Sequence, residues 1–247
     1  MLKNTFLHIP YINEKTETFL WNKGFKDWDS CLNCNQKIIS QMDLLKKFIL
    51  LSIQNYQNHE FFSQRLETKH HWRAYPDFKE KACFLDIETT GLDKKKDDLT
   101  LIGLYEPLTK KSKFFILGKN MPLFKEEIKK YSYIITFNGF LFDLPFIREK
   151  FNINFNQLHA DLRFIFNNLG YKGGLKKIEK DLGIIRNTDV KDGLEAIHLW
   201  NYYKKYNDEM ALHKLIDYNY EDIKNLHFLM EFGFEKMKEK TINNFNI

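Results

Sequence analysis

The stretch that decides the fold is Cys83-Phe84-Leu85-Asp86-Ile87-Glu88-Thr89-Thr90-Gly91-Leu92. It predicts a short apolar strand that carries two carboxylates and ends at a glycine. Side chains of a strand alternate between faces, so Asp86 and Glu88 project from the same face. Two carboxylates on one face repel each other unless a cation lies between them, and a divalent metal ion suits such an oxygen-rich pair. A half-exposed strand with two solvated acids is the alternative, since so short a motif often arises by chance.

The size and composition of the chain are those of a globular protein. Its 247 residues suffice for one large domain, or for one domain with a small appendage. Hydrophobic residues make up 43% and charged residues 29%. No apolar run reaches the length of a membrane span, the N-terminus shows no secretory signal, and three cysteines make no disulfide framework. We therefore expect a cytoplasmic protein with no membrane partner.

The formal net charge is +5, a modest excess of basic groups. Lysines gather locally, at positions 94–96, 110–113 and 172–180. Such clusters attract phosphate backbones and add salt-dependent affinity for nucleic acid. A run of charge is also what an ordinary solvated face looks like, so no single cluster identifies a binding surface.

Residues 1–75 read as a helical region distinct from residues 76–247. Apolar residues at helical spacing and the adjoining stop signals predict helices over 14–22, 36–55 and around 61–66. Residues 72–76 are expected to form an extended connector, because Pro76 disfavours helix in the residue before it.

The segment Phe6–Asn13 and the helix after it resemble a helix-hairpin-helix module, which binds nucleic-acid backbone through hairpin amides. That geometry normally uses two glycines, and here Tyr11 and Asn13 stand in their places. Asparagine tolerates a left-handed backbone, whereas tyrosine does so poorly. We therefore expect a degenerate, mainly structural version, whose helices could also meet a protein partner.

Cys31-Leu32-Asn33-Cys34 is a C-x-x-C pair. A structural zinc site needs four ligands, and no second close pair of cysteine or histidine accompanies this one. A redox function would need a thioredoxin-like context that is missing here. Two ordinary buried or half-buried cysteines are expected.

From about residue 81 the sequence predicts an α/β domain with a mixed five-stranded sheet flanked by helices. The expected strands are 82–88, 99–105, 113–117 and 133–137, with a fifth ending near Asp161. The expected helices are 122–130, 175–182 and 212–229. Asp161 is expected to cap the helix that follows it or to bind His159, instead of reaching the metal.

Three further residues carry chemistry. Asp143 follows the fourth strand, at the carboxyl end of the sheet, where a carboxylate can face a ligand. It could equally cap the helix that begins there. Tyr218 and Asp222 are four residues apart on a late helix and share one face, although Tyr218 could be an ordinary packed aromatic.

Together, these residues resemble the DEDD exonucleases of the ribonuclease H-like superfamily, in the variant with tyrosine four residues before the last aspartate (DEDDy). The three motifs are Asp86–Gly91, Asn138–Asp143 and Tyr218–Asp222. Residues 72–75, 136–139 and 192–196 fit the YprB-like branch of that group more closely. The resemblance extends from about Trp72 to Leu229, and no acid departs from the pattern.

The resemblance implies a hydrolase that removes nucleoside monophosphates from a single-stranded 3′ end with two divalent cations, Mg²⁺ or Mn²⁺. Asp86 would be the ligand shared by both ions, Glu88 and Asp222 would hold the ion beside the attacking water, and Asp143 would act on the other. Tyr218 would orient that water. The expected contacts of the terminal nucleotide are Thr89, Thr90, Leu92, Asn138 and Phe142. DNA and RNA stay open as substrates. A catalytically silent nucleic-acid-binding or interaction module and an endonuclease are the alternatives.

Overall fold

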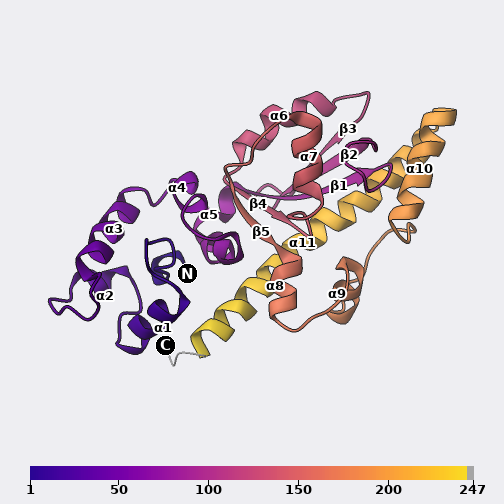
Figure 1. Cartoon of the computed structure of the whole chain (residues 1–247). Helices are drawn as coiled ribbons and strands as arrows, with labels where there is room; N and C mark the ends of the chain where they lie inside the picture. Colours follow the sequence, from indigo (N-terminus) through magenta and orange to yellow (C-terminus); the bar gives the residue numbers. More distant parts are fainter. Residues whose placement is uncertain (244–247) are drawn as a thin grey trace.

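The computed structural model describes residues 1–243 (Figure 1). They form one sheet with the strand order β3-β2-β1-β4-β5. The strands are β1 (Ala82–Thr89), β2 (Leu99–Glu106), β3 (Lys111–Ile116), β4 (Tyr133–Thr136) and β5 (Leu158–Asp161). β2 is antiparallel to both β1 and β3, whereas β1, β4 and β5 run parallel. The predicted mixed five-stranded sheet is confirmed, with β3 beginning two residues earlier than expected.

The helices cover both faces of this sheet and form the N-terminal region. They are α1 (Glu14–Asn22), α2 (Trp28–Leu32), α3 (Met42–Gln54), α4 (His59–Ser63), α5 (Tyr75–Phe78), α6 (Phe124–Glu127), α7 (Asp143–Phe151), α8 (Leu162–Asn168), α9 (Leu175–Asp181), α10 (Gly193–Tyr206) and α11 (Glu209–Asn243). Short 3₁₀ turns are η1 (Leu2–Asn4), η2 (Thr68–Ala74), η3 (Lys79–Lys81), η4 (Met121–Leu123) and η5 (Ile128–Lys130). None of these helices is long and apolar enough to span a membrane.

The expected extended connector at residues 72–76 is wrong. This segment lies in η2 and α5, and Tyr75 takes helical angles, φ −54° and ψ −49°. Pro76 occupies the first turn of α5, where proline is tolerated because its missing N–H has no helical partner. Tyr75 is buried, and its hydroxyl donates to Oε1 of Glu231 at 2.7 Å. Tertiary packing thus outweighs the local bias against helix before proline.

The two faces of β1 pack against different layers. Cys83, Leu85 and Ile87 share a core with residues of α6 and α7, whereas Ala82 and Phe84 share a core with α11. Because side chains alternate along a strand, Asp86 and Glu88 point to the α11 side. Figure 1 shows α11 running beneath the sheet along this face. The sheet therefore presents both acids to the last helix.

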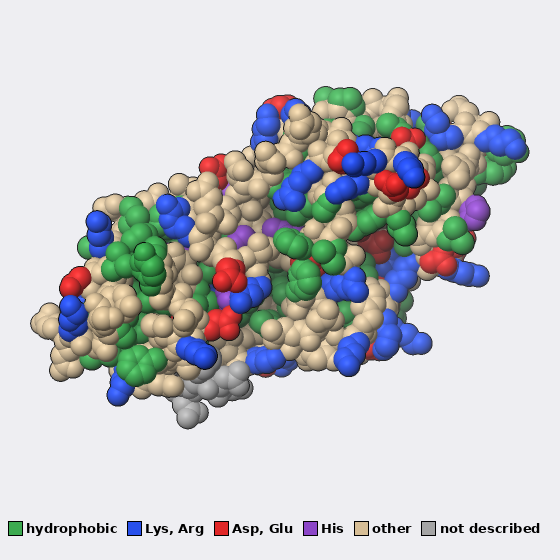
Figure 2. Space-filling model, viewed as in Figure 1, with side chains coloured by type: hydrophobic (Ala, Val, Ile, Leu, Met, Phe, Trp, Pro, Cys, Tyr) green, Lys and Arg blue, Asp and Glu red, His purple; other side chains and the backbone are tan. Residues whose placement is uncertain are grey.

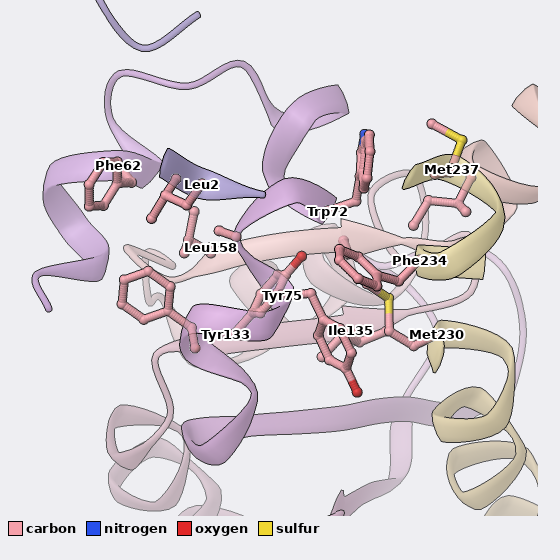
Figure 3. Packing of buried hydrophobic residues seen from close by; sticks show 14 of the residues in the cluster. Leu2, Phe62, Trp72, Tyr75, Tyr133, Ile135, Leu158, Met230, Phe234 and Met237 are labelled. Atoms are coloured by element: carbon pink, nitrogen blue, oxygen red, sulfur yellow. The ribbon is translucent and has the colours of Figure 1, made fainter. Parts of the chain in front are cut away.

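The N-terminal region packs on the sheet domain through a shared core (Figure 3). The residues that meet there include Leu2, Phe62, Trp72, Tyr133, Leu158, Phe234 and Met237. A buried ion pair holds the N-terminal region together, because Nη1 of Arg73 in η2 donates to Oε2 of Glu17 in α1 at 2.8 Å. The other oxygen of Glu17 accepts from the hydroxyl of Thr5 and the amide of Phe6, both at 2.7 Å.

The hairpin before α1 contains Tyr11, which takes a left-handed φ of +66° and is 81% exposed. Asn13 caps α1 by accepting from the amide of Thr16 at 2.9 Å. The helix-hairpin-helix identity of this region stays a prediction.

The two cysteines of the C-x-x-C pair are free thiols, Cys31 buried and Cys34 half-buried. Burial raises the pKa of Cys31 to about 12. Within the described chain neither cysteine belongs to a cluster with metal-ligand geometry.

Candidate metal centre

Asp86 and Glu88 meet Asp222 at the face between β1 and α11. One carboxylate oxygen from each of the three residues lies within 4.8 Å of the other two. Glu88 and Asp222 are buried, and Asp86 is half-buried. The resemblance of the motifs implied this convergence, and the structure brings these three acids together. Three carboxylate donors at such spacing match the hard oxygen ligands that Mg²⁺ and Mn²⁺ prefer.

The charge of these acids is poorly compensated by the protein. Burial, followed by repulsion from Asp222 and Asp143, raises the pKa of both Asp86 and Glu88 well above the ordinary carboxyl range. Burial also raises the pKa of Asp222, to about 6, although the adjacent Arg186 guanidinium opposes this rise. A divalent cation between the carboxylates would remove the repulsion, so the donor set fits a metal ion by its charge as well as by its chemistry.

Asp143 is the first residue of α7 and is buried, with 3% of its surface exposed. Burial raises its pKa to about 7, and interactions with its own amide and the amide of Ile87 partly oppose this. It lies outside the cluster of three oxygens, yet its charge acts on both Asp86 and Glu88. Phe142, not Asp143, holds the N-cap position of α7, and no side chain caps that helix. The alternative function as a helix cap is thus not the one observed.

Asp161 has the structural function expected of it. One of its oxygens accepts from the amides of Asn138 at 2.7 Å and Arg163 at 3.0 Å, and the other accepts from Phe140 at 3.0 Å. It therefore caps α8 and fixes the loop that leads from β4 to Asp143. The ring of His159 instead pairs with the hydroxyl of Thr136 at 2.9 Å.

Tyr218 lies on α11 one turn before Asp222 and is 6% exposed. Burial, followed by the negative charges of Asp222 and Glu88, raises the pKa of its phenol above the ordinary value. Nζ of Lys176 sits 4.4 Å from the centre of the Tyr218 ring, within cation–π range. The tyrosine thus keeps its proton at neutral pH, and a cation from α9 lies over its face.

A buried ionic network lies behind Asp222, and no sequence pattern predicts it. Arg186, in the irregular segment after α9, pairs with both Asp222 and Glu179. Glu179 is 1% exposed and also accepts from Nδ2 of Asn225 at 2.9 Å. Arg186 has no periodic or motif context, and only the fold brings it to the acids. Asn219 lies inside the third motif, but the motif predicts no function for it.

The residues that were expected to contact a nucleotide lie at the end of β1, in two loops and at the start of α7, and most of them make local contacts. Thr89 Oγ1 donates to the carbonyl of Gly91 at 2.6 Å, and Thr90 Oγ1 accepts from the amide of Asp98 at 2.8 Å. Leu92 is 85% exposed. Asn138 has φ +66° and accepts from Arg163 at 2.7 Å, while Phe142 packs on Phe146. Their contacts with a nucleotide stay a prediction.

Figure 2 shows acidic side chains set back in a hollow on the α9 and α10 side of the molecule, with Lys and Arg side chains around it.

A sequence model of the family RNase_H_2, part of the RNase_H superfamily, matches residues 83–232. The chain belongs to the RNase_H superfamily. The matched range includes the four acids and all of the strands except the first residue of β1, and the RNase H-like fold follows from it. A search of curated proteins found no match.

Two solved structures resemble this RNase H-like chain. One is the family B DNA polymerase from the hyperthermophilic archaeon Pyrobaculum calidifontis, with a TM-score of 0.47 and 14% identity over 65% of this chain. The chain spans only 24% of that polymerase. The other is Brucella melitensis NrnC bound to pGG, with a TM-score of 0.46 and 16% identity over 68% of this chain and 79% of NrnC.

Proposed function

We propose that the protein is a metal-dependent 3′–5′ exonuclease of the DEDDy type, in the YprB-like branch, that hydrolyses phosphodiester bonds. The observation that carries the proposal is the meeting of Asp86, Glu88 and Asp222 oxygens within 4.8 Å of one another. Asp143 acts electrostatically on the same group, and Tyr218 lies one helical turn from Asp222. The three motifs that resemble this class therefore contribute to one buried, charged site.

The cofactors we propose are two divalent cations, Mg²⁺ or Mn²⁺. When bound, such ions supply Lewis-acid activation of water and neutralise charge on the phosphate. Asp86 would bind both ions, Glu88 and Asp222 would hold the ion beside the attacking water, and Asp143 would act on the second ion through its water shell. Buried carboxylates that repel one another are the groups most stabilised by this arrangement.

Tyr218 would orient the attacking water through its hydroxyl. Its raised pKa keeps the phenol protonated at neutral pH, so it acts as a hydrogen-bonding group and not as a base. Lys176, over the tyrosine ring, would fix the ring plane and add positive charge beside the phosphate. Removal of the water proton then falls to solvent or to the carboxylates.

The substrate we propose is a single-stranded 3′ end of DNA or RNA, cut to nucleoside monophosphates. Thr89, Thr90, Leu92, Asn138 and Phe142 would meet the terminal nucleotide. We further propose that residues 1–75 form a helical accessory region, whose helices could meet a protein partner, and residues 76–247 the nuclease domain.

A comparison of linear with closed circular single-stranded DNA and RNA tests this function. With Mn²⁺, the linear strand should disappear into mononucleotides while the circle of equal sequence stays intact, because the circle offers no 3′ end. Cutting of the circle would establish the endonuclease alternative. Binding of both forms without any cleavage would establish the silent binding module.

A further inference from the structure

We propose that Asn219 is a positioning residue that ties the carboxylates of Asp86 and Glu88 together, and that Gly103 is required to seat it. Nδ2 of Asn219 donates to Oδ2 of Asp86 at 2.8 Å and to Oε1 of Glu88 at 3.3 Å. One amide group thus reaches both acids of β1 from α11. Its place in the helix, one residue after Tyr218 and three before Asp222, puts it against the strand and not in solvent.

The environment of Asn219 indicates a dedicated function. The side chain is 0% exposed, and its Oδ1 atom is buried with no hydrogen-bond partner among the described residues. An unpaired buried oxygen lowers stability, so an asparagine kept only for stability should have a partner at each end. Here only the donor end is paired, and both of its partners are carboxylates of the candidate metal centre.

Gly103 explains how the amide fits. It lies in β2 directly opposite Asp86, and a Cβ atom at this position would lie 1.8 Å from Oδ1 of Asn219. The backbone there has no left-handed φ, so its conformation does not demand glycine. Glycine in a strand interior is unfavourable and commonly marks the close approach of another group. That group is the Asn219 amide.

A neutral amide suits this position for an electrostatic reason. Asp86 and Glu88 repel each other, and a hydrogen-bond donor between them holds their oxygens in one orientation. A lysine or arginine would do the same but would also neutralise the charge that attracts a cation. An amide donates without a net charge, so it orients the ligands and leaves their charge available. Groups that orient metal ligands in this way commonly contribute 10–100-fold to metal affinity.

The inference rests on the proposed metal-dependent function, and its test reads metal binding and unfolding instead of cleavage. We would measure the Mn²⁺ dissociation constant and the urea midpoint in EDTA for wild type, N219L, N219A, G103A and the double variant N219A/G103A. Leucine is larger than asparagine and alanine is smaller, and neither has a donor, so a loss of Mn²⁺ affinity shared by N219L and N219A reports hydrogen bonding and not packing. His213→Ala, at an exposed site on α11, is the matched control.

The expected result is that N219L and G103A each weaken Mn²⁺ binding about tenfold or more, while H213A changes it less than about twofold. A second, metal-independent comparison uses N219A, which removes the two Asn219 atoms that a Cβ at position 103 would meet at 1.8 and 3.0 Å and leaves Cδ1 of Ile223 at 3.2 Å. G103A should lower the urea midpoint strongly in the wild-type background and much less in N219A.

Unchanged Mn²⁺ affinity in N219L, beside a wild type that binds the ion, would overturn the positioning function. An equal fall in the urea midpoint when G103A is introduced into wild type and into N219A would show that Gly103 does not seat Asn219. That result would overturn the proposed requirement for glycine at position 103. If the wild type binds no Mn²⁺, the proposed metal-dependent function fails and the positioning function fails with it. The unfolding comparison in EDTA still decides the seating by Gly103 in that case.

Discussion

Arg186 donates from Nη2 to Oδ1 of Asp222 at 2.6 Å, so a buried guanidinium lies directly behind a candidate metal ligand. The same guanidinium donates from Nη1 to both oxygens of Glu179, at 3.0 and 2.8 Å. One positive charge is therefore shared between two buried acids. This sharing holds Asp222 in place, whereas within residues 1–243 no lysine or arginine forms a direct ion pair with Asp86 or Glu88.

We expect Arg186→Met to lower the free energy of unfolding by about 3–5 kcal/mol, because two buried acids would lose their counter-charge. Urea unfolding at pH 7 measures this change. The control is Lys177→Ala, which breaks an exposed ion pair with Asp181 and should cost less than about 1 kcal/mol. Equal midpoints for the two variants would contradict the importance of the buried network.

Asp143→Asn should change the pH dependence of stability in EDTA. Asp143 keeps its proton up to about pH 7 in the folded protein, whereas an unfolded aspartate loses its proton near pH 4. The ionisation of Asp143 therefore lowers the stability of wild type as the pH rises through this window, and an amide at position 143 removes this one contribution. Relative to wild type, the free energy of unfolding of the variant should rise by about 1–3 kcal/mol between pH 4 and pH 7.5. A difference that stays constant with pH would show that Asp143 titrates normally.

Addition of Mn²⁺ should raise the Tm of wild type, because the ion binds only where the folded chain gathers its acids. Asp222→Asn should abolish most of this rise, while Glu126→Gln, at an exposed acid on α6, should keep all of it. Differential scanning fluorimetry over a Mn²⁺ titration gives the comparison. A similar rise in all three proteins would place metal binding elsewhere in the chain.

Tyr218→Phe should slow cleavage by roughly ten- to a hundredfold, less than the loss of an acid, because a water-orienting hydrogen bond contributes less than a metal ligand. Burial of the ring is unchanged by phenylalanine, so the fold should persist. Single-turnover cleavage rates of the variant and of wild type measure the effect. An unchanged rate would remove the tyrosine from the reaction.

Local periodicity explains which parts of the site the sequence could predict. Asp86 and Glu88 share a strand face, and Tyr218 and Asp222 share a helix face, so each pair follows from backbone geometry alone. The strand pattern also placed the sheet, since each run of apolar residues ended at a turn signal. The convergence of Asp86, Glu88 and Asp222 followed from the resemblance of the motifs.

The parts that escaped prediction depend on tertiary contacts. Arg186 lies in an irregular segment and acquires its function only when the fold brings Asp222 beside it. Tyr75 is helical before a proline because its hydroxyl and ring are held in the core. Gly103, in an apolar strand, carries the signal for close approach of another group, but which group approaches is settled only by α11 lying across β2.

The most direct test of the account is digestion of 5′-labelled single-stranded DNA and RNA with Mn²⁺ by wild type and by Asp86→Ala. Wild type should give a ladder that shortens from the 3′ end, and the folded variant should give none. A ladder of equal intensity from the variant, or no metal-dependent shortening by wild type, would contradict the assignment of Asp86, Glu88 and Asp222 as the catalytic metal centre.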